Sequence, residues 1–91
     1  MSLSGQVAMV TGAGRGIGRA IAVGFAREGA RVAVTGRTKE RRHRVAAEIV
    51  AQGGEAQAFV LDVTRDEQAE QAVKDILAIW GQIDILVNND V

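Results

Sequence analysis

The sequence of 91 residues contains no cysteine, no proline and no tyrosine. Without cysteine, the chain can form neither a disulfide framework nor a thiolate metal site. Lysine and arginine number 11, as do aspartate and glutamate, so no overall basic charge is present to hold nucleic acid. No apolar run approaches the roughly 20 residues that a membrane-spanning helix needs. These absences predict a protein with no nucleic-acid partner, no membrane partner and no metal site.

The first ten residues, MSLSGQVAMV, lack the charged start and the long apolar core of a signal peptide. Together with the lack of cysteine, this start favours a cytoplasmic location. Hydrophobic residues make up 47% of the chain, which is typical of a globular protein. The length allows one small domain, so we expect residues 1–91 to form a single domain.

Short apolar runs alternate with helical stripes along the chain. Four continuous runs, at 7–10, 32–35, 58–61 and 83–87, predict parallel strands that are covered on both faces. Thr64 and Glu67 have the spacing of a capping box for the third helix. Trp80, at the end of that helix, is expected to be a core residue. Three stripes of apolar residues predict the helices: Ile17, Ala20, Ile21, Gly24 and Phe25; Val45, Ala46, Ile49 and Val50; and Ala69, Ala72, Val73, Ile76, Leu77 and Trp80.

This alternation of strand and helix predicts an α/β fold built of parallel βαβ units. Right-handed crossovers then favour a Rossmann-type, three-layer arrangement with a parallel sheet of order 3-2-1-4, truncated after strand 4. In such a sheet the ligand binds beyond the carboxyl ends of strands 1 and 4, where the strand order reverses.

Four glycines stand at alternate positions after the first strand, in the stretch Thr11-Gly12-Ala13-Gly14-Arg15-Gly16-Ile17-Gly18. Glycine permits positive φ angles and lets the backbone approach a ligand closely. A helix that begins near Arg15 or Gly16 directs free N–H groups and its positive dipole end towards the same gap. The stretch therefore predicts a pyrophosphate site, and we expect Gly18 and Gly24 to let the helix lie close to the sheet. The alternative is a tight turn without a ligand, since the spacing matches neither the G-x-G-x-x-G fingerprint nor a P-loop.

Three segments of the chain resemble the short-chain dehydrogenases/reductases, in register along nearly the whole chain. They are the glycine stretch, Leu61-Asp62-Val63, and Ile83-Asp84-Ile85-Leu86-Val87-Asn88-Asn89. The resemblance extends to NADP-dependent 3-oxoacyl-reductase-like members, and it implies that the glycines form the family's cofactor-binding turn. It also implies that Asp62 lies beside the adenine amino group, with Val63 against the ring. Asn88 and Asn89 are implied to touch the cofactor's ribose and to brace the sheet.

The end of the second strand, Thr35-Gly36-Arg37-Thr38, indicates which nicotinamide cofactor is bound. NAD-specific folds place an acidic residue near this point to accept hydrogen bonds from the ribose hydroxyls, but Gly36 has no side chain. Arg15 and Arg37 instead predict charge-assisted contacts with the 2′-phosphate of NADP; the alternative is that both are solvated. Most of the basic run is expected to be a solvated face, with one member near the phosphate as the less favoured alternative: Lys39, Arg41, Arg42 and Arg44.

The predicted cofactor is therefore NADP(H), and His43 is expected to be a surface residue. The predicted cofactor-binding residues are Gly12, Gly14, Arg15, Gly16, Ile17, Gly18, Arg37, Thr38, Asp62, Val63, Asn88 and Asn89.

Catalysis in the family uses a serine and a Tyr-x-x-x-Lys pair beyond the Asn-Asn segment, and this chain contains no tyrosine. The resemblance thus implies the N-terminal, NADP(H)-binding half of an oxidoreductase, with no catalytic residue and no activity of its own. A stand-alone, non-catalytic nucleotide-binding or assembly fragment is the alternative. Asp90 and Val91 stand where the family has alanine and glycine, which disfavours close approach of the cofactor there. An exposed apolar edge on the fourth strand, with Ile83, Ile85, Leu86 and Val87, predicts association with a second copy or with the missing half.

Overall fold

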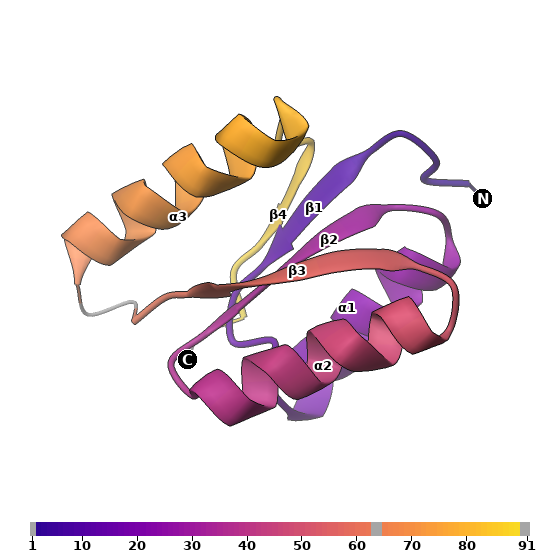
Figure 1. Cartoon of the computed structure of the whole chain (residues 1–91), viewed down its shortest axis with the longest axis horizontal. Coiled ribbons are helices and arrows are strands. Elements are labelled where there is room, and N and C mark those ends of the chain that lie inside the picture. Colours follow the sequence, from indigo (N-terminus) through magenta and orange to yellow (C-terminus); the bar gives the residue numbers. More distant parts are fainter. Residues whose placement is uncertain (1, 63–64, 90–91) are drawn as a thin grey trace.

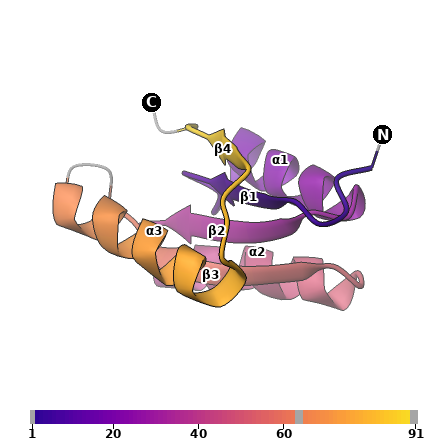
Figure 2. The ribbon, with the colours of Figure 1, turned by 90° about the horizontal axis from the view of Figure 1, so that it is seen from above.

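The computed structural model describes residues 2–62 and 65–89 of the chain. Its seven elements alternate strand and helix: β1 (Val7–Val10), α1 (Gly16–Arg27), β2 (Arg31–Gly36), α2 (Lys39–Ala51), β3 (Glu55–Val60), α3 (Asp66–Trp80) and β4 (Ile85–Val87). The four strands form one parallel sheet of order β3-β2-β1-β4, which confirms the predicted order (Figure 2).

Helices cover both faces of the sheet, so the fold has three layers (Figure 1). Helices α1 and α2 lie on one face, over a core that includes Val10, Val34 and Ile49. Helix α3 lies on the other face, over a second core that includes Met9, Leu61 and Ile76. The central strand β1 is buried along its whole length, as a strand covered on both faces must be. The predicted Rossmann-type architecture is therefore confirmed.

The two edge strands differ from their predicted bounds. Strand β3 begins at Glu55, three residues before the predicted start, because it pairs with β2 along its whole length. An edge strand needs no continuous apolar run, so the polar start of β3 gave no strand signal. Strand β4 begins at Ile85, two residues after the predicted start, and Asp84 just before it is hydrogen-bonded to Val7 of β1. Its carboxylate accepts the N–H of Val7 at 2.8 Å, and its own N–H donates to the Val7 carbonyl at 2.8 Å.

Helix α1 buries its predicted stripe only in part, because Ile21 and Phe25 pack against the core but the most buried positions lie beside the stripe. Gly18, Ala22 and Val23 are buried, whereas Ile17 is 72% exposed. The predicted role of Gly24 is wrong, because this residue is exposed and a Cβ added to it meets nothing within 4 Å. The fully buried positions of α1 therefore carry small side chains, while Ile17 faces outward.

Two stripes on the other helices are partly wrong. Val50 on α2 and Leu77 on α3 are exposed, although their predicted neighbours Ile49 and Ile76 are buried. Trp80 is half-buried rather than a core residue. Its ring packs edge-on against Phe59, with centroids 6.4 Å apart, and its indole N–H donates to the Glu55 carboxylate at 2.9 Å. The indole N–H needs a polar partner, so one end of the ring stays at the surface.

The predicted capping box cannot be judged, because Thr64 lies outside the described residues. In the described part, Arg65 occupies the N-cap position of α3 and makes no side-chain cap. Gln68 reaches back instead, and its side-chain oxygen accepts the N–H of Asp62 at 2.8 Å. This contact ties the end of β3 to the first turn of α3.

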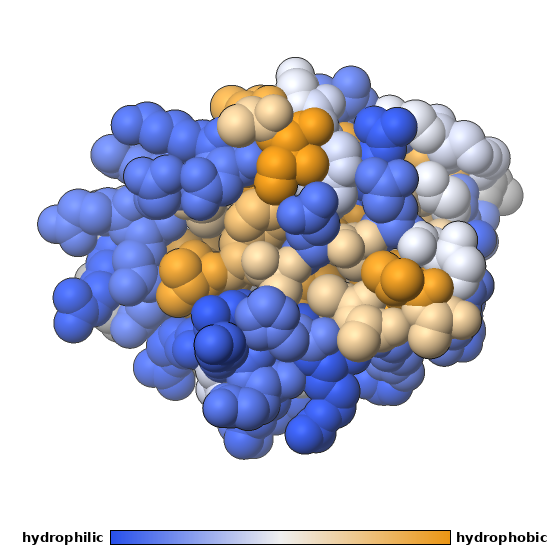
Figure 3. All heavy atoms as spheres, in the orientation of Figure 1, coloured by the Kyte–Doolittle hydropathy of each residue, from blue (hydrophilic) through white to orange (hydrophobic). Residues whose placement is uncertain are grey.

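Apolar surface gathers in a band between α2 and α3 (Figure 3). The exposed apolar side chains of these helices and of the edge strand β3 include Val60 on β3, Val50 on α2 and Leu77 on α3. At the opposite edge of the sheet, Leu86 of β4 is 64% exposed. Of the predicted apolar edge on the fourth strand, only Leu86 is exposed, whereas Ile83, Ile85 and Val87 are half-buried.

Candidate functional site

The glycine turn lies between the carboxyl ends of β2 and β4. The N–H of Thr11 donates to the Val87 carbonyl at 2.9 Å, and the N–H of Ala13 donates to the Thr35 carbonyl at 3.0 Å. Gly12 has a φ of +61°, which a side chain would strain. The turn is thus anchored to both neighbouring strands, at the predicted point where the strand order reverses.

Gly18 fixes how closely α1 approaches this turn. A Cβ added to Gly18 lies 2.2 Å from the Gly12 carbonyl oxygen and 2.6 Å from Nδ2 of Asn89. Both distances are far below van der Waals contact, so only glycine fits here. The predicted role of Gly18 in close packing is supported by this geometry, and it holds the start of α1 over the end of β1.

Asn88 and Asn89 connect β4 to the same turn. The Thr11 hydroxyl accepts the N–H of Asn89 at 2.9 Å, and it lies 3.2 Å from the Val87 carbonyl and 3.3 Å from Oδ1 of Asn88. The Asn89 side chain also donates to the Gly12 carbonyl at 3.4 Å. Thr11 itself is buried, so this small polar network braces the glycine turn against the sheet.

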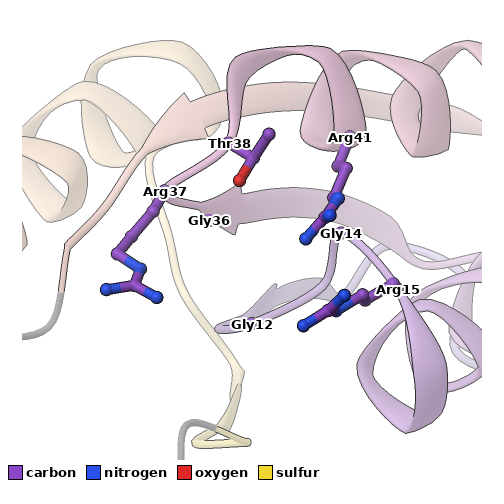
Figure 4. Close-up of a pocket in the computed structure, with 7 residues that line it drawn as sticks. All are labelled: Gly12, Gly14, Arg15, Gly36, Arg37, Thr38 and Arg41. Atoms are coloured by element: carbon purple, nitrogen blue, oxygen red, sulfur yellow. The ribbon is translucent and has the colours of Figure 1, made fainter.

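A pocket of about 170 Å³ opens beside the turn (Figure 4). It is lined by three arginines and by no carboxylate; the lining residues are Gly12, Gly14, Arg15, Gly36, Arg37, Thr38 and Arg41. In Figure 4, Arg41 extends from α2 and Arg15 from the start of α1 into the space beside Gly14. Arg37 extends from the end of β2 on the other side of Gly36. The sequence predicted that Arg15, Arg37 and Thr38 would share a site, and the fold brings them together.

The pocket has a positive electrostatic character from the backbone as well. Arg15 occupies the N-cap position of α1, caps no N–H with its side chain, and is followed by no acidic residue in the first turn. Unsatisfied N–H groups and the positive end of the helix dipole favour an anion at this point. Of the ion pairs within residues 2–62 and 65–89, Arg19–Glu48 and Arg31–Glu55, neither involves a pocket arginine.

The basic run at the start of α2 divides into different environments. Arg41 lines the pocket and is the one member of the run to do so, as in the less favoured alternative given for this run. Arg42 donates to the carbonyls of Gly36 and Arg37, each at 3.3 Å, and so holds the turn between β2 and α2. His43 and Arg44 are exposed, and for His43 this was predicted.

Sequence reasoning did not single out Arg41, although one signal for it was available. Gly14 is the signal, because a Cβ added to it lies 2.9 Å from the Cβ of Arg41. The helix α2 therefore packs directly on the glycine turn, and it carries Arg41 with it. A glycine with no unusual φ angle in a turn indicates a close neighbour, but the neighbour's identity depends on the crossover geometry.

The other predicted site residues do not belong to the lining of the pocket. Asp62 follows β3, half-buried, at the same carboxyl edge of the sheet. Gly16 and Ile17 open α1. Val63 lies outside the described residues, as do Asp90 and Val91, whose departure from the family pattern was predicted to matter.

No group of three or more histidine, aspartate or glutamate residues in 2–62 and 65–89 could hold a metal ion. In the same part of the chain, no helix has the length and apolar character needed to cross a membrane.

Several known proteins are similar to this chain in sequence and in fold. A sorbitol dehydrogenase of Cereibacter sphaeroides is 48% identical over 98% of this chain. A 3-oxoacyl-[acyl-carrier-protein] reductase of Synechocystis sp. is 43% identical over 97% of it. A metagenomic short-chain oxidoreductase, solved in complex with NADP, matches 99% of this chain with a TM-score of 0.93 and 48% identity. A hydroxysteroid dehydrogenase from Escherichia coli gives a TM-score of 0.94 at 38% identity over 96% of this chain.

The chain spans about a third of the length of the curated relatives, 34% and 36% for these two, and 41% and 37% of the two solved chains. The model of the short chain dehydrogenase family matches residues 6–90, a range that includes the glycine turn and the ends of β3 and β4. With that match over nearly all of its residues, the chain belongs to the short chain dehydrogenase family.

Proposed function

We propose that this chain is the NADP(H)-binding portion of a short-chain oxidoreductase that acts on a carbonyl or alcohol substrate. The observation that carries the proposal is the pocket in which Arg15, Arg37 and Arg41 meet around Gly36, with no carboxylate in its lining. The match to an oxidoreductase solved in complex with NADP supports it. When bound, a nicotinamide dinucleotide supplies the hydride of such a reaction.

The residues present fit this group. The main-chain N–H groups at the start of α1, beside Gly12, would hold the pyrophosphate. Asp62 would lie at the adenine and Asn88 and Asn89 at a ribose, all at the same carboxyl edge of the sheet. Each of these contacts follows from the resemblance to the family, and each is compatible with the place of the residue in the fold.

Preference for NADP(H) over NAD(H) follows from the chemistry of the pocket. Guanidinium groups form charge-assisted and bidentate hydrogen bonds with phosphate, and these are roughly twice as strong as neutral ones. An NAD-selective site instead needs an acidic acceptor for the ribose hydroxyls, and Gly36 supplies none. We therefore expect NADPH to bind at least about tenfold more tightly than NADH, which corresponds to about 1.4 kcal/mol.

The chain by itself is proposed to bind the cofactor without catalysing hydride transfer. It contains no tyrosine, the residue type that the family uses as general acid and base at the substrate oxygen. Leu86 on the exposed edge of β4 supports association with a second copy or with a further segment of an oxidoreductase.

Calorimetric titration of the purified chain with NADPH and with NADH tests the proposal. We expect one binding event with NADPH, a weaker one with NADH, and no oxidation of NADPH when carbonyl compounds are added. NADH affinity equal to or greater than NADPH affinity would refute the proposed cofactor preference. Binding of neither dinucleotide would refute the proposed function itself.

A further inference from the structure

The ends of β2 and β3 meet at a single main-chain oxygen. The Gly36 carbonyl accepts the N–H of Leu61 at 3.1 Å, which joins the last residue of β2 to the residue that follows β3. The Arg42 guanidinium donates to the same carbonyl and to the carbonyl of Arg37, each at 3.3 Å. Arg42 therefore contacts the junction of the two strand ends together with the turn that leads into α2.

The turn between β2 and α2 has no side-chain cap of its own. Thr38 occupies the N-cap position of α2 and makes no capping hydrogen bond, although Glu40 in the first turn complements the helix dipole. Arg42 is half-buried, and neither of the ion pairs between described residues includes it. Its charge is directed at main-chain oxygens instead, and a hydrogen bond from a charged donor is stronger than one from a neutral donor. The Arg42 side chain thus stabilises the turn in place of a cap.

This junction lies where the proposed function places the adenosine half of the dinucleotide. Gly36 is at the point where dinucleotide-binding folds contact the adenosine ribose, and Asp62, next to Leu61, is expected at the adenine. Because the Gly36 carbonyl connects these two segments, a shift of the turn changes the position of the ribose side relative to the adenine side. Arg42 does not line the pocket, so it acts on a ligand only through the turn.

We infer that Arg42 is a positioning residue, which holds the ends of β2 and β3 in place for the adenosine half of the cofactor, whether or not that half carries a 2′-phosphate. This inference rests on the proposed function. It differs from the phosphate contacts proposed for Arg15 and Arg37, because a displaced turn weakens every ligand that contains adenosine. A turn that is not held in advance must be ordered when the ligand binds, and this ordering lowers the affinity.

The test compares Arg42→Gln and Arg42→Lys with Arg44→Gln as the matched control. Arg44 is exposed on the same helix and does not line the pocket, so its variant removes the same charge without a change at the turn. Arg42→Lys keeps the charge on a shorter side chain that lacks the planar fork of donors. All variants and the wild-type chain are titrated with 5′-AMP, 2′,5′-ADP, NADH and NADPH. Circular dichroism and urea unfolding verify that each chain is folded, and Arg42→Lys decides the test if Arg42→Gln is not.

We expect Arg42→Gln to weaken the binding of all four ligands about fivefold, with an unchanged ratio of NADPH to NADH affinity, because the ordering cost is common to them. Arg42→Lys should lose about threefold on all four, and Arg44→Gln should stay within about twofold of the wild type. In nitrogen–proton NMR spectra of the free chains, the Leu61 amide signal should move in the Arg42 variants and stay in place in Arg44→Gln.

Two results would overturn the positioning role of Arg42. One is a folded Arg42 variant that binds all four ligands as tightly as the wild type, since the contact would then serve stability alone. The other is a loss confined to 2′,5′-ADP and NADPH, which would make Arg42 a direct phosphate contact. A wild-type chain that binds none of the four ligands would instead refute the proposed function, and this inference with it.

Discussion

Replacing Gly36 with aspartate introduces a carboxylate into a pocket lined by three arginines. The structure has room for the side chain, since a Cβ added to Gly36 meets its nearest atom, the main-chain nitrogen of Gly14, at 4.0 Å. Gly36 also lies outside the positive-φ glycines, so aspartate adopts its backbone conformation without strain. The substitution therefore changes the charge of the pocket and leaves its shape nearly intact.

The expected magnitude follows from the charges. Two unit charges about 4 Å apart near a protein surface interact by roughly 4 kcal/mol before desolvation and screening. The new carboxylate repels the 2′-phosphate and also competes with it for Arg15, Arg37 or Arg41. We expect a net loss of about 1.4–2.8 kcal/mol, or about 10- to 100-fold weaker NADPH binding. NADH should gain about fivefold, because the carboxylate accepts hydrogen bonds from the ribose hydroxyls.

Calorimetric titration of Gly36→Asp with both dinucleotides measures these two changes, and Gly36→Asn is the matched control of nearly equal size without the charge. Asparagine should weaken NADPH binding by no more than about threefold. The electrostatic reasoning is refuted if Gly36→Asp binds NADPH as tightly as the wild type. It is equally refuted if the asparagine variant loses as much affinity as the aspartate variant, since the effect would then be steric.

Three further predictions concern the frame of the site. Gly18→Ala should destabilise the chain by about 3 kcal/mol in urea unfolding, since its Cβ meets a carbonyl oxygen at 2.2 Å. Gly24→Ala, at an exposed position, should instead stabilise the chain by about 0.5–1 kcal/mol. A similar loss of stability in both variants would contradict the packing described. Thr11→Val should cost about 1–3 kcal/mol because the Asn89 N–H loses its acceptor, and a neutral outcome shows the network to be unimportant. Leu86→Lys should reduce self-association in light scattering without lowering the unfolding midpoint, and an unchanged molar mass in a chain that self-associates rejects β4 as the contact edge.

The architecture was predictable because its signals are local. Continuous apolar runs, as in β1, and glycine-terminated helical stripes fix the alternation, and the handedness of crossovers then leaves few sheet orders. The face that α1 buries was predictable only in part, since apolar residues lie on both flanks of that helix and the most buried ones are Ala22 and Val23 rather than Ile21 and Phe25. Its rotation is decided by the contact of Gly18 with Gly12, a contact between the two ends of one turn.

The residues of the candidate site also divide into those that the sequence predicted and those that it did not. The shared pocket of Arg15 and Arg37 was predictable from their positions in the chain. Each residue follows the carboxyl end of a parallel strand, and these ends lie at the same edge of the sheet. Arg41 depends on how α2 packs against the glycine turn, and a basic run gives no sign of which member faces inward. The missed start of β3 has a related cause, because its pairing partner, rather than its own hydropathy, makes Glu55 part of a strand.

The central claim is that the glycine turn and the pocket arginines together bind a 2′-phosphorylated dinucleotide. The most direct measurement is a nitrogen–proton NMR titration of the chain with NADPH and, separately, with NADH. We expect the main-chain amides of residues 12–18 to shift with both ligands, and the Nε–H signals of Arg15, Arg37 and Arg41 to shift strongly with NADPH only. Unmoved amides at 12–18, or arginine signals that respond equally to both ligands, would contradict the account.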